Sequence, residues 1–238
     1  VARGKEVGVQ LRRRTSLKSI KKDGTDFLVT VETDSETKDL RADLVVHGAG
    51  RVPAIDQLDL AAANVEAGDK GVAVNAYLQS TSNPKIYAAG DAADTQGAPL
   101  TPVAVFEGKV AASNMLKGNR TKPDYSGVPS AVFTVPELTR VGMLEQDARE
   151  AGHDIRVVEN DTGDWYSNLR VGESCAATKV IIDKDSDTIL GAHLLGPEYG
   201  EIINFFGLAI RLGLTTSDLK KMVSVYPSVG SDLGSMLS

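Results

Sequence analysis

The chain has 238 residues, 42% of them hydrophobic, and a formal net charge of −6. The hydrophobic content suffices for a buried core, and the length suits one large domain or two ordinary ones. The acidic balance argues against nucleic acid as the main partner, and no apolar run is long enough to cross a bilayer. We also find no signal-like segment, so we expect no membrane partner and a cytoplasmic location by default.

Cysteine and histidine are sparse in this sequence. Cys175 is the single cysteine, which excludes both an internal disulfide framework and a redox dithiol within the chain. It precedes an apolar segment and is expected to be a small core residue. The three histidines have no metal-ligand spacing, so we predict no metal site. The first residue is Val1 rather than methionine, and we therefore expect the chain to be the later part of a longer protein.

Three segments near the amino terminus are predicted to be strands, namely 7–11, 27–32 and 43–47. Polar turn compositions separate them, and the alternating pattern favours an antiparallel ribbon. The third segment differs because it is continuously apolar and ends in Gly-Ala-Gly, as a strand buried on both faces would. We therefore expect residues 43–47 to lie inside a parallel sheet.

A strand is predicted at 71–75, followed by an apolar segment at 86–89 that leads into Gly90 and Asp91. The clearest helix spans 100–118, with an N-cap at Thr101, a proline in the first turn and a glycine at the end. Its interior glycine, Gly108, is unfavourable in a helix, so we expect close packing against another backbone there.

Residues 118–130 collect Gly, Pro and Ser, which is typical of a domain boundary. Beyond them we predict strands at 130–135, 154–159, 176–183 and 189–195, and helices at 144–152, 198–213 and 216–223. Antiparallel strands combined with helices indicate an α+β domain.

Two glycine motifs are candidate nucleotide-binding sites. Gly48 and Gly50 have the first spacing of a dinucleotide fingerprint, but Pro53 stands at the third glycine position and no helical pattern follows. These residues form either a tight turn or a turn that lines a cofactor. The second motif is sharper, because a strand ending at Asp91 projects a carboxylate at the carboxyl edge of a sheet, where such sheets bind ligands.

The helix that begins near Thr101 adds to this second motif. Its free N–H groups and positive dipole end suit an electron-rich or anionic group. Asp91 could accept hydrogen bonds from sugar-like hydroxyls, although an acid at a strand end is also often a simple cap.

Several motifs in register resemble a known family. They are DLVVHGAGRVP, STSNPKIYAAGDAAD, LTPVAVFEGKVAASNML, AVFTVPELTRVGMLEQDAREAG, ILGAHLLG and VYPSVGSD. In order and spacing they resemble the carboxyl half of the flavin-dependent pyridine nucleotide-disulfide oxidoreductases, the family of glutathione reductase, dihydrolipoamide dehydrogenase and mercuric reductase. The resemblance implies the end of an NAD(P)-binding domain at 1–48, part of an FAD-binding α/β domain at 49–120, and an α+β dimerisation domain at 121–238.

The resemblance also implies roles for individual residues and a homodimer. Asp91, after Gly90, resembles the acid that binds the ribityl and pyrophosphate region of FAD. Gly50 resembles the glycine that lines the nicotinamide cofactor, and Val132 resembles a residue on the nicotinamide side. The helix start that is aimed at the flavin pyrimidine ring corresponds to Thr101, Pro102, Val103 and Ala104.

The sequence departs from the family at its carboxyl end. Tyr226, before Pro227, stands where the family has an acid-base histidine, and Ser231 stands where it has a glutamate. A tyrosine has a pKa of about 10, so it is a poor base near neutrality but can donate a proton. Tyr226 is therefore our candidate catalytic residue, with packing at the interface as the alternative.

The expected function follows from these matches and departures. The final residues contain no cysteine pair, which argues against mercuric ion as the acceptor. We expect an oxidoreductase that passes electrons from NAD(P)H through FAD to a disulfide or another small acceptor. The alternative is a non-catalytic dimerisation module of such an enzyme.

Overall fold

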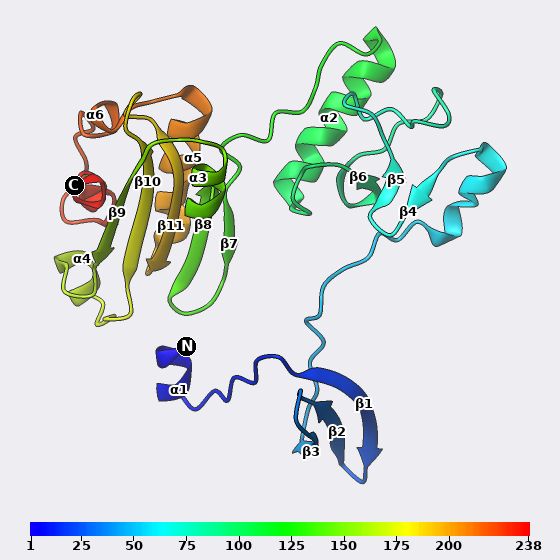
Figure 1. The fold of residues 1–238 in the computed structure, drawn as a ribbon, viewed down its shortest axis with the longest axis horizontal. Helices are drawn as coiled ribbons and strands as arrows, with labels where there is room; N and C mark the ends of the chain where they lie inside the picture. Colours follow the sequence, from blue (N-terminus) through cyan, green and yellow to red (C-terminus); the bar gives the residue numbers. More distant parts are fainter. The chain divides into compact units, whose positions relative to one another are not determined.

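The computed structural model describes residues 1–238 apart from the side chain of Ala2. It forms two compact units, Val1–Arg51 and Val52–Ser238. The first unit contains a short helix and a three-stranded antiparallel sheet in the order β1-β2-β3 (Figure 1). Its elements are α1 (Ala2–Glu6), β1 (Ser16–Asp23), β2 (Asp26–Glu32) and β3 (Thr37–Ala42). An antiparallel ribbon is present, but only β2 confirms a predicted strand, that at 27–32, because β1 and β3 lie between the predicted segments.

The strands predicted at 7–11 and 43–47 are wrong. Both segments lack strand structure, and Leu44 and Val46 are 72% and 80% exposed. A strand buried on both faces needs a hydrogen-bonded neighbour on each side, and among the described residues no strand pairs with 43–47. The segment 43–47 is continuously apolar, but no described strand pairs with it, so the expected place inside a parallel sheet is wrong.

The first part of the second unit carries a small sheet and one long helix (Figure 1). The sheet pairs β4 with β5 in antiparallel fashion and β5 with β6 in parallel fashion. Its elements are η1 (Asp56–Leu58), η2 (Leu60–Ala63), β4 (Ala67–Gly68), β5 (Gly71–Ala73), η3 (Gly90–Ala92), β6 (Ala93–Asp94) and α2 (Thr101–Lys117). The predicted strand at 71–75 therefore begins as expected. The strand expected before Asp91 is reduced to a single bridge between Gln79 and Tyr87, and a 3₁₀ turn follows at Gly90.

Helix α2 matches its predicted span closely, with two differences. Leu100, not Thr101, is the N-cap residue, and Thr101 opens the helix with Pro102 behind it. The expectation for Gly108 was wrong, because among the described atoms nothing lies within 4 Å of where its Cβ would be. Gly108 thus faces open space. The buried face of α2 is formed by Val103, Glu107, Val110, Ala111 and Asn114.

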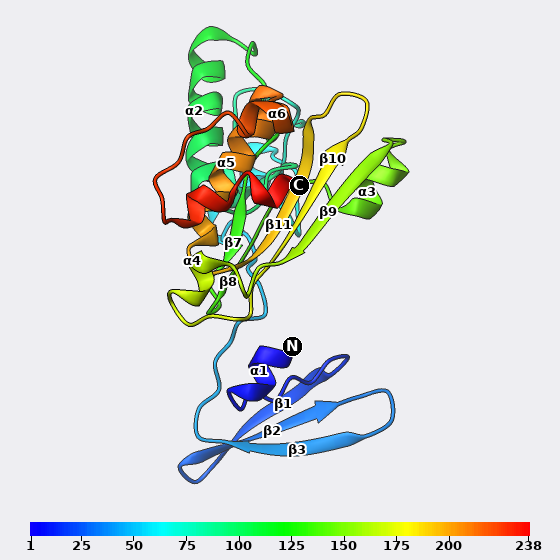
Figure 2. The ribbon, with the colours of Figure 1, turned by 90° about the vertical axis from the view of Figure 1, so that its left-hand side faces the viewer.

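The rest of the second unit is a five-stranded antiparallel sheet in the order β7-β8-β11-β10-β9. Helix α5 covers one face and α3 packs on the other (Figure 2). The elements are β7 (Ser130–Val132), β8 (Glu137–Gly142), α3 (Glu145–Glu150), β9 (Ile155–Asp161), α4 (Tyr166–Leu169), β10 (Ala177–Asp183), β11 (Ile189–Gly196), α5 (Tyr199–Leu212), α6 (Thr216–Leu219), η4 (Val229–Asp232) and η5 (Ser235–Leu237).

The main core lies between α5 and this sheet. Ile203 and Phe206 of α5 meet Val180 and Leu194 of the central strands, and all four are fully or almost fully buried. Burying one such side chain stabilises the fold by about 1.5–3 kcal/mol. The four strands and three helices predicted here are confirmed in type, whereas β8 and α4 were missed. Among the described residues, no helix is both long and apolar enough to span a membrane.

Candidate functional site

The turn at Gly90 and Asp91 packs directly on the start of α2. Gly90 has a φ of +64°, which only glycine adopts freely. A Cβ placed on Gly90 would lie 2.8 Å from the Cβ of Ala104 in the first turn of the helix. The missing side chain therefore allows the turn that carries Asp91 to rest against the amino end of α2.

The amino end of α2 offers backbone donors. Within the described chain no side chain caps it, and its first turn contains no acid. The first helical hydrogen bond runs from Ala104 N to Leu100 O at 2.9 Å, so the N–H groups of Thr101 and Val103 precede the helical ladder. Pro102 has no N–H. This helix start combines N–H donors with the positive end of the helix dipole, which favours an electron-rich group.

A buried carboxylate holds the turn from the other side. Glu107 is only 1% exposed, and its carboxylate accepts three hydrogen bonds. Oε2 accepts from Gly90 N at 2.6 Å, while Oε1 accepts from the Thr95 hydroxyl at 2.8 Å and from the Tyr125 hydroxyl at 2.6 Å. A buried carboxylate is tolerable only when it is satisfied in this way.

The tyrosine in this cluster keeps its proton. Burial raises the pKa of Tyr125 to about 12, and the hydrogen bond to Glu107 acts in the same direction. An ionised phenol beside a buried carboxylate would place two negative charges together, which both effects disfavour. The Tyr125 hydroxyl is therefore a donor to Glu107 at every physiological pH.

The linker that carries Tyr125 is also fixed to α5. Arg211 donates to the backbone oxygens of Asp124 and Ser126 at 3.2 and 2.8 Å. Next along the chain, Gly127 lies against Gly207, where a Cβ on Gly207 would be 2.7 Å from the Gly127 oxygen. The linker backbone therefore rests on the backbone of α5, while the Tyr125 side chain reaches the buried face of α2.

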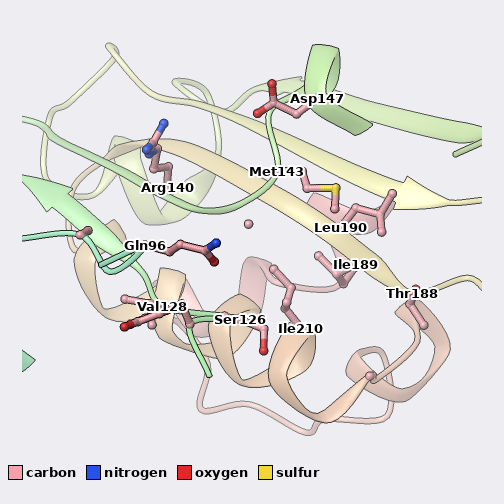
Figure 3. A pocket seen from close by; sticks show the side chains of 15 residues that line it. Gln96, Ser126, Val128, Arg140, Met143, Asp147, Thr188, Ile189, Leu190 and Ile210 are labelled. Carbon is pink, nitrogen blue, oxygen red and sulfur yellow. The ribbon is translucent and has the colours of Figure 1, made fainter. Parts of the chain in front are cut away.

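A pocket of about 630 Å³ opens beside the linker (Figure 3). Gln96 extends into it, and Met143, Leu190 and Ile210 form apolar parts of its wall (Figure 3). Arg140 contributes a charge to its lining. None of the residues predicted to bind the cofactor lines this pocket.

The other predicted site residues lie on separate elements. Gly50, with a φ of +98°, belongs to the first unit. Val132 ends β7 and is 58% exposed. Tyr226 follows α6, is 75% exposed and stacks on Tyr166 with ring centroids 6.5 Å apart. The structure thus brings together Gly90, Asp91 and residues 101–104 and places the other three elsewhere, while the functional role of every one of these residues stays a prediction.

An apolar surface is exposed on α5 and on the segment after α6. Leu208 is 52% exposed in the middle of the helix. Exposed apolar side chains that form a contiguous patch are typical of protein interfaces, and each of these two segments carries several such side chains. The set consists of Phe205, Leu208, Leu212, Met222, Val223, Val225 and Tyr226.

Sequence reasoning missed Glu107 and Tyr125 as members of the site. A signal was present for Glu107, which lies four residues after Val103 and three before Val110 and so falls on the apolar face of the helix. An acid on such a face needs partners. For Tyr125 no local pattern marks the contact, because its partner lies 18 residues away on another element.

Two family models match the chain. The dimerisation domain of the pyridine nucleotide-disulphide oxidoreductases matches residues 128–236. The pyridine nucleotide-disulphide oxidoreductase model matches residues 2–108. Together they span both units, and the chain belongs to the pyridine nucleotide-disulphide oxidoreductase family.

Relatives of two lengths are found. An uncharacterized 19.7 kDa protein in a mercuric resistance operon of Staphylococcus aureus is 51% identical over 180 residues, which is 76% of this chain and all of that relative. Mercuric reductase of Staphylococcus aureus is 32% identical over 96% of this chain, but the match spans only 41% of that enzyme. The chain thus covers less than half the length of this reductase.

A solved structure shows the same fold. The HOCl-induced flavoprotein disulfide reductase RclA from Escherichia coli aligns with a TM-score of 0.85 and 27% identity. The alignment covers 98% of this chain and 52% of that protein.

Proposed function

We propose that this chain forms the carboxyl-terminal portion of an oxidoreductase that passes electrons from NAD(P)H through FAD to a disulfide or another small acceptor. The observation that carries this proposal is the seating of the Gly90 turn on the start of α2. The absence of a side chain at Gly90 lets the turn rest on Ala104, with Asp91 beside it and N–H donors at the helix end. Both features suit a ligand that has sugar-like hydroxyls and an electron-rich ring.

The residues of this chain would act by binding and orienting the cofactor. When bound, FAD supplies the two-electron relay between the nicotinamide and the acceptor. Asp91 would accept hydrogen bonds from the ribityl hydroxyls, and the start of α2 would stabilise negative charge on the pyrimidine ring through its dipole. Gly50 and Val132 would line the nicotinamide side.

The proposed enzyme is a homodimer. The exposed apolar residues of α5 and of 222–226 supply a surface that a second copy would cover. In this arrangement Tyr226 would reach the acceptor site of the partner subunit, where its hydroxyl can donate a hydrogen bond or a proton. The acceptor remains a class of compound, either a disulfide or another small oxidant.

The test is FAD binding by the full-length protein, measured by titration calorimetry on wild type, Asp91→Asn and Asp94→Asn. Asp94 is a matched control because it is an exposed acid of the neighbouring strand β6. We expect Asp91→Asn to weaken FAD binding by about tenfold or more, as loss of hydrogen bonds to a charged group would. Asp94→Asn should bind like the wild type. Equal affinity of all three proteins would contradict the assignment of Asp91.

A second candidate is a non-catalytic dimerisation module. It is favoured by the relative of 180 residues, which this chain matches over that relative's whole length. In that case the wild-type protein would sediment as a dimer but would take up no FAD in the same titration. Binding of FAD by the wild type would exclude this candidate.

A further inference from the structure

We propose that Glu107 is a positioning residue that couples the seating of the linker on α5 to the conformation of the turn at Gly90 and Asp91. Its effect on flavin binding rests on the function proposed above. The coupling itself is a property of the protein alone and is testable without a cofactor.

The Glu107 carboxylate joins three segments of the chain. Glu107 belongs to α2, Gly90 and Thr95 belong to the turn region that flanks β6, and Tyr125 belongs to the linker. Because the two carboxylate oxygens share a rigid plane, a shift of the hydroxyl bonded to Oε1 rotates the group and moves Oε2 relative to Gly90 N. The position of the turn therefore depends on the position of Tyr125.

The atoms around Glu107 and Tyr125 are closely packed. A Cβ on Gly97 would lie 2.6 Å from Glu107 Oε1 and 2.8 Å from Tyr125 Cε1. The backbone of Gly97 thus closes the space beside the bonded pair. Since Glu107 is almost fully buried, bulk water does not readily replace a lost donor, and the carboxylate must move instead.

The third step connects Tyr125 to the dimerisation part of the chain. The backbone oxygen of the neighbouring Ser126 accepts a hydrogen bond from Arg211, and Gly127 lies against Gly207 of the same helix. Loosening the linker from α5 would therefore displace the Tyr125 hydroxyl. The line of contacts runs from α5 through the linker and Glu107 to the turn.

The side chain at position 107 is better suited to positioning the Gly90 turn than to simple packing. The position falls on the buried face of α2 between Val103 and Val110, where an apolar side chain would fill the space without needing partners. A buried carboxylate adds little net stability over a hydrophobic residue, but it demands its donors in a defined geometry. Three donors from two other segments meet that demand here.

The experiment is amide hydrogen exchange at Gly90, followed by NMR on the full chain without cofactor. Tyr125→Phe should raise the exchange rate of the Gly90 amide by roughly tenfold, which corresponds to the free energy of about one hydrogen bond. The matched control is Tyr87→Phe, which removes a 2.7 Å bond from a phenol to Asn119 in the same part of the fold without touching Glu107. It should leave Gly90 within about twofold of wild type.

Arg211→Ala tests the long-range step. It should raise exchange at Gly90 in the wild-type background but have little further effect in the Y125F background, because the path through Tyr125 is already cut. A purely structural role predicts the opposite pattern, with equal acceleration of all core amides and additive effects. Additive effects, or an unchanged Gly90 amide in Y125F, would overturn the coupling.

Two further measurements keep the outcome clear. If Y125F does not fold, Glu107→Gln serves instead, because glutamine has only one neutral oxygen, a weaker acceptor, and an NH2 group that cannot accept, so the three donors can no longer all be satisfied and the Gly90 amide should exchange faster. FAD titration of the same proteins separates the two proposals. A Gly90 amide that responds in a protein without FAD affinity supports the coupling and overturns the flavin assignment.

Discussion

The hydroxyl of Tyr125 lies 2.6 Å from Oε1 of Glu107 and donates to it, which joins the linker to the buried face of α2. Each partner depends on the other. The phenol fills one acceptor position of a buried carboxylate, and burial together with that carboxylate keeps the phenol protonated. This one bond therefore joins the face of α2 that holds the Gly90 turn to the segment that leads into the dimerisation domain.

Stability at high pH should depend on Tyr125. The pKa of Tyr125 is raised to about 12 in the folded protein, compared with about 10 when it is exposed in the unfolded chain. A raised folded pKa gives stability that is fully present below pH 10 and is lost as the pH rises toward 12. Urea unfolding from pH 8 to pH 12 should show a shallower loss in Tyr125→Phe than in the wild type. Parallel pH profiles would contradict this expectation.

Stability at low pH should depend on two half-buried aspartates. The pKa of Asp183 is lowered to about 2, first by the Ser186 backbone N–H and then by His153. That of Asp218 is lowered to about 2 by Lys221 and by the Thr215 cap. Depressed values give stability that is present above the unfolded pKa near 4 and is lost as the pH falls toward 2.

The corresponding variants are Asp183→Asn and Asp218→Asn, each compared with wild type by thermal unfolding between pH 2 and pH 6. Each variant should be less stable than the wild type at pH 6, and the difference should shrink toward pH 2. A difference that stays constant over this range would show that the carboxylates do not act through their charge.

Two glycines near each other along the chain should respond in opposite directions to alanine. Gly90→Ala forces a Cβ to within 2.8 Å of Ala104 and onto a backbone with positive φ, so we expect a loss of about 1–3 kcal/mol in unfolding free energy. Gly108→Ala places a methyl in open space inside a helix and should gain up to about 1 kcal/mol. Chemical unfolding measures both, and similar effects in the two variants would refute the close packing at Gly90.

A charged substitution tests the proposed dimer surface on α5. Leu208→Asp places a carboxylate in the exposed apolar surface of α5 and should shift the protein toward monomers, because an unpaired charge is costly to bury in an interface. Leu17→Asp is the control, since Leu17 is similarly exposed on β1. Sedimentation equilibrium distinguishes them. Retention of the dimer in Leu208→Asp would place the interface elsewhere.

Replacing Tyr226 tests whether its hydroxyl takes part in the reaction or its ring only packs against Tyr166. Because the side chain is 75% exposed, Tyr226→Phe should change stability by no more than about 0.5 kcal/mol. If the hydroxyl donates a proton in the reaction, turnover of the full-length enzyme should fall by about 10²–10⁴-fold. Unchanged turnover would leave only the stacking on Tyr166 as its role.

Elements with strong local signals were predictable from the sequence. Helix α2 has a proline in its first turn and a glycine directly after its last residue, and α5 has a continuous apolar face, so both were found within a few residues. In contrast, 43–47 has the composition of a buried strand but no strand beside it among the described residues. A local sequence pattern indicates whether a segment prefers to be buried, whereas a strand also needs a neighbouring strand to pair with.

The candidate site divides in the same way. Gly90, Asp91 and the start of α2 were predicted because each carries its own local signal. Glu107 and Tyr125 were missed because their meaning lies in a contact between α2 and the linker. An acid on an apolar helix face announces that a partner exists, but not which residue it is.

The close approach of Gly127 and Gly207 bears on where the protein can be cut. Since the linker backbone lies directly on α5, residues 124–128 belong to the folded cover of that helix rather than to a free tether. A shortened protein that starts before Asp124 would keep this cover, whereas one that starts after Val128 would bare the backbone of α5 and the Arg211 side chain. Limited proteolysis should accordingly spare residues 124–128, because their backbone is held on α5.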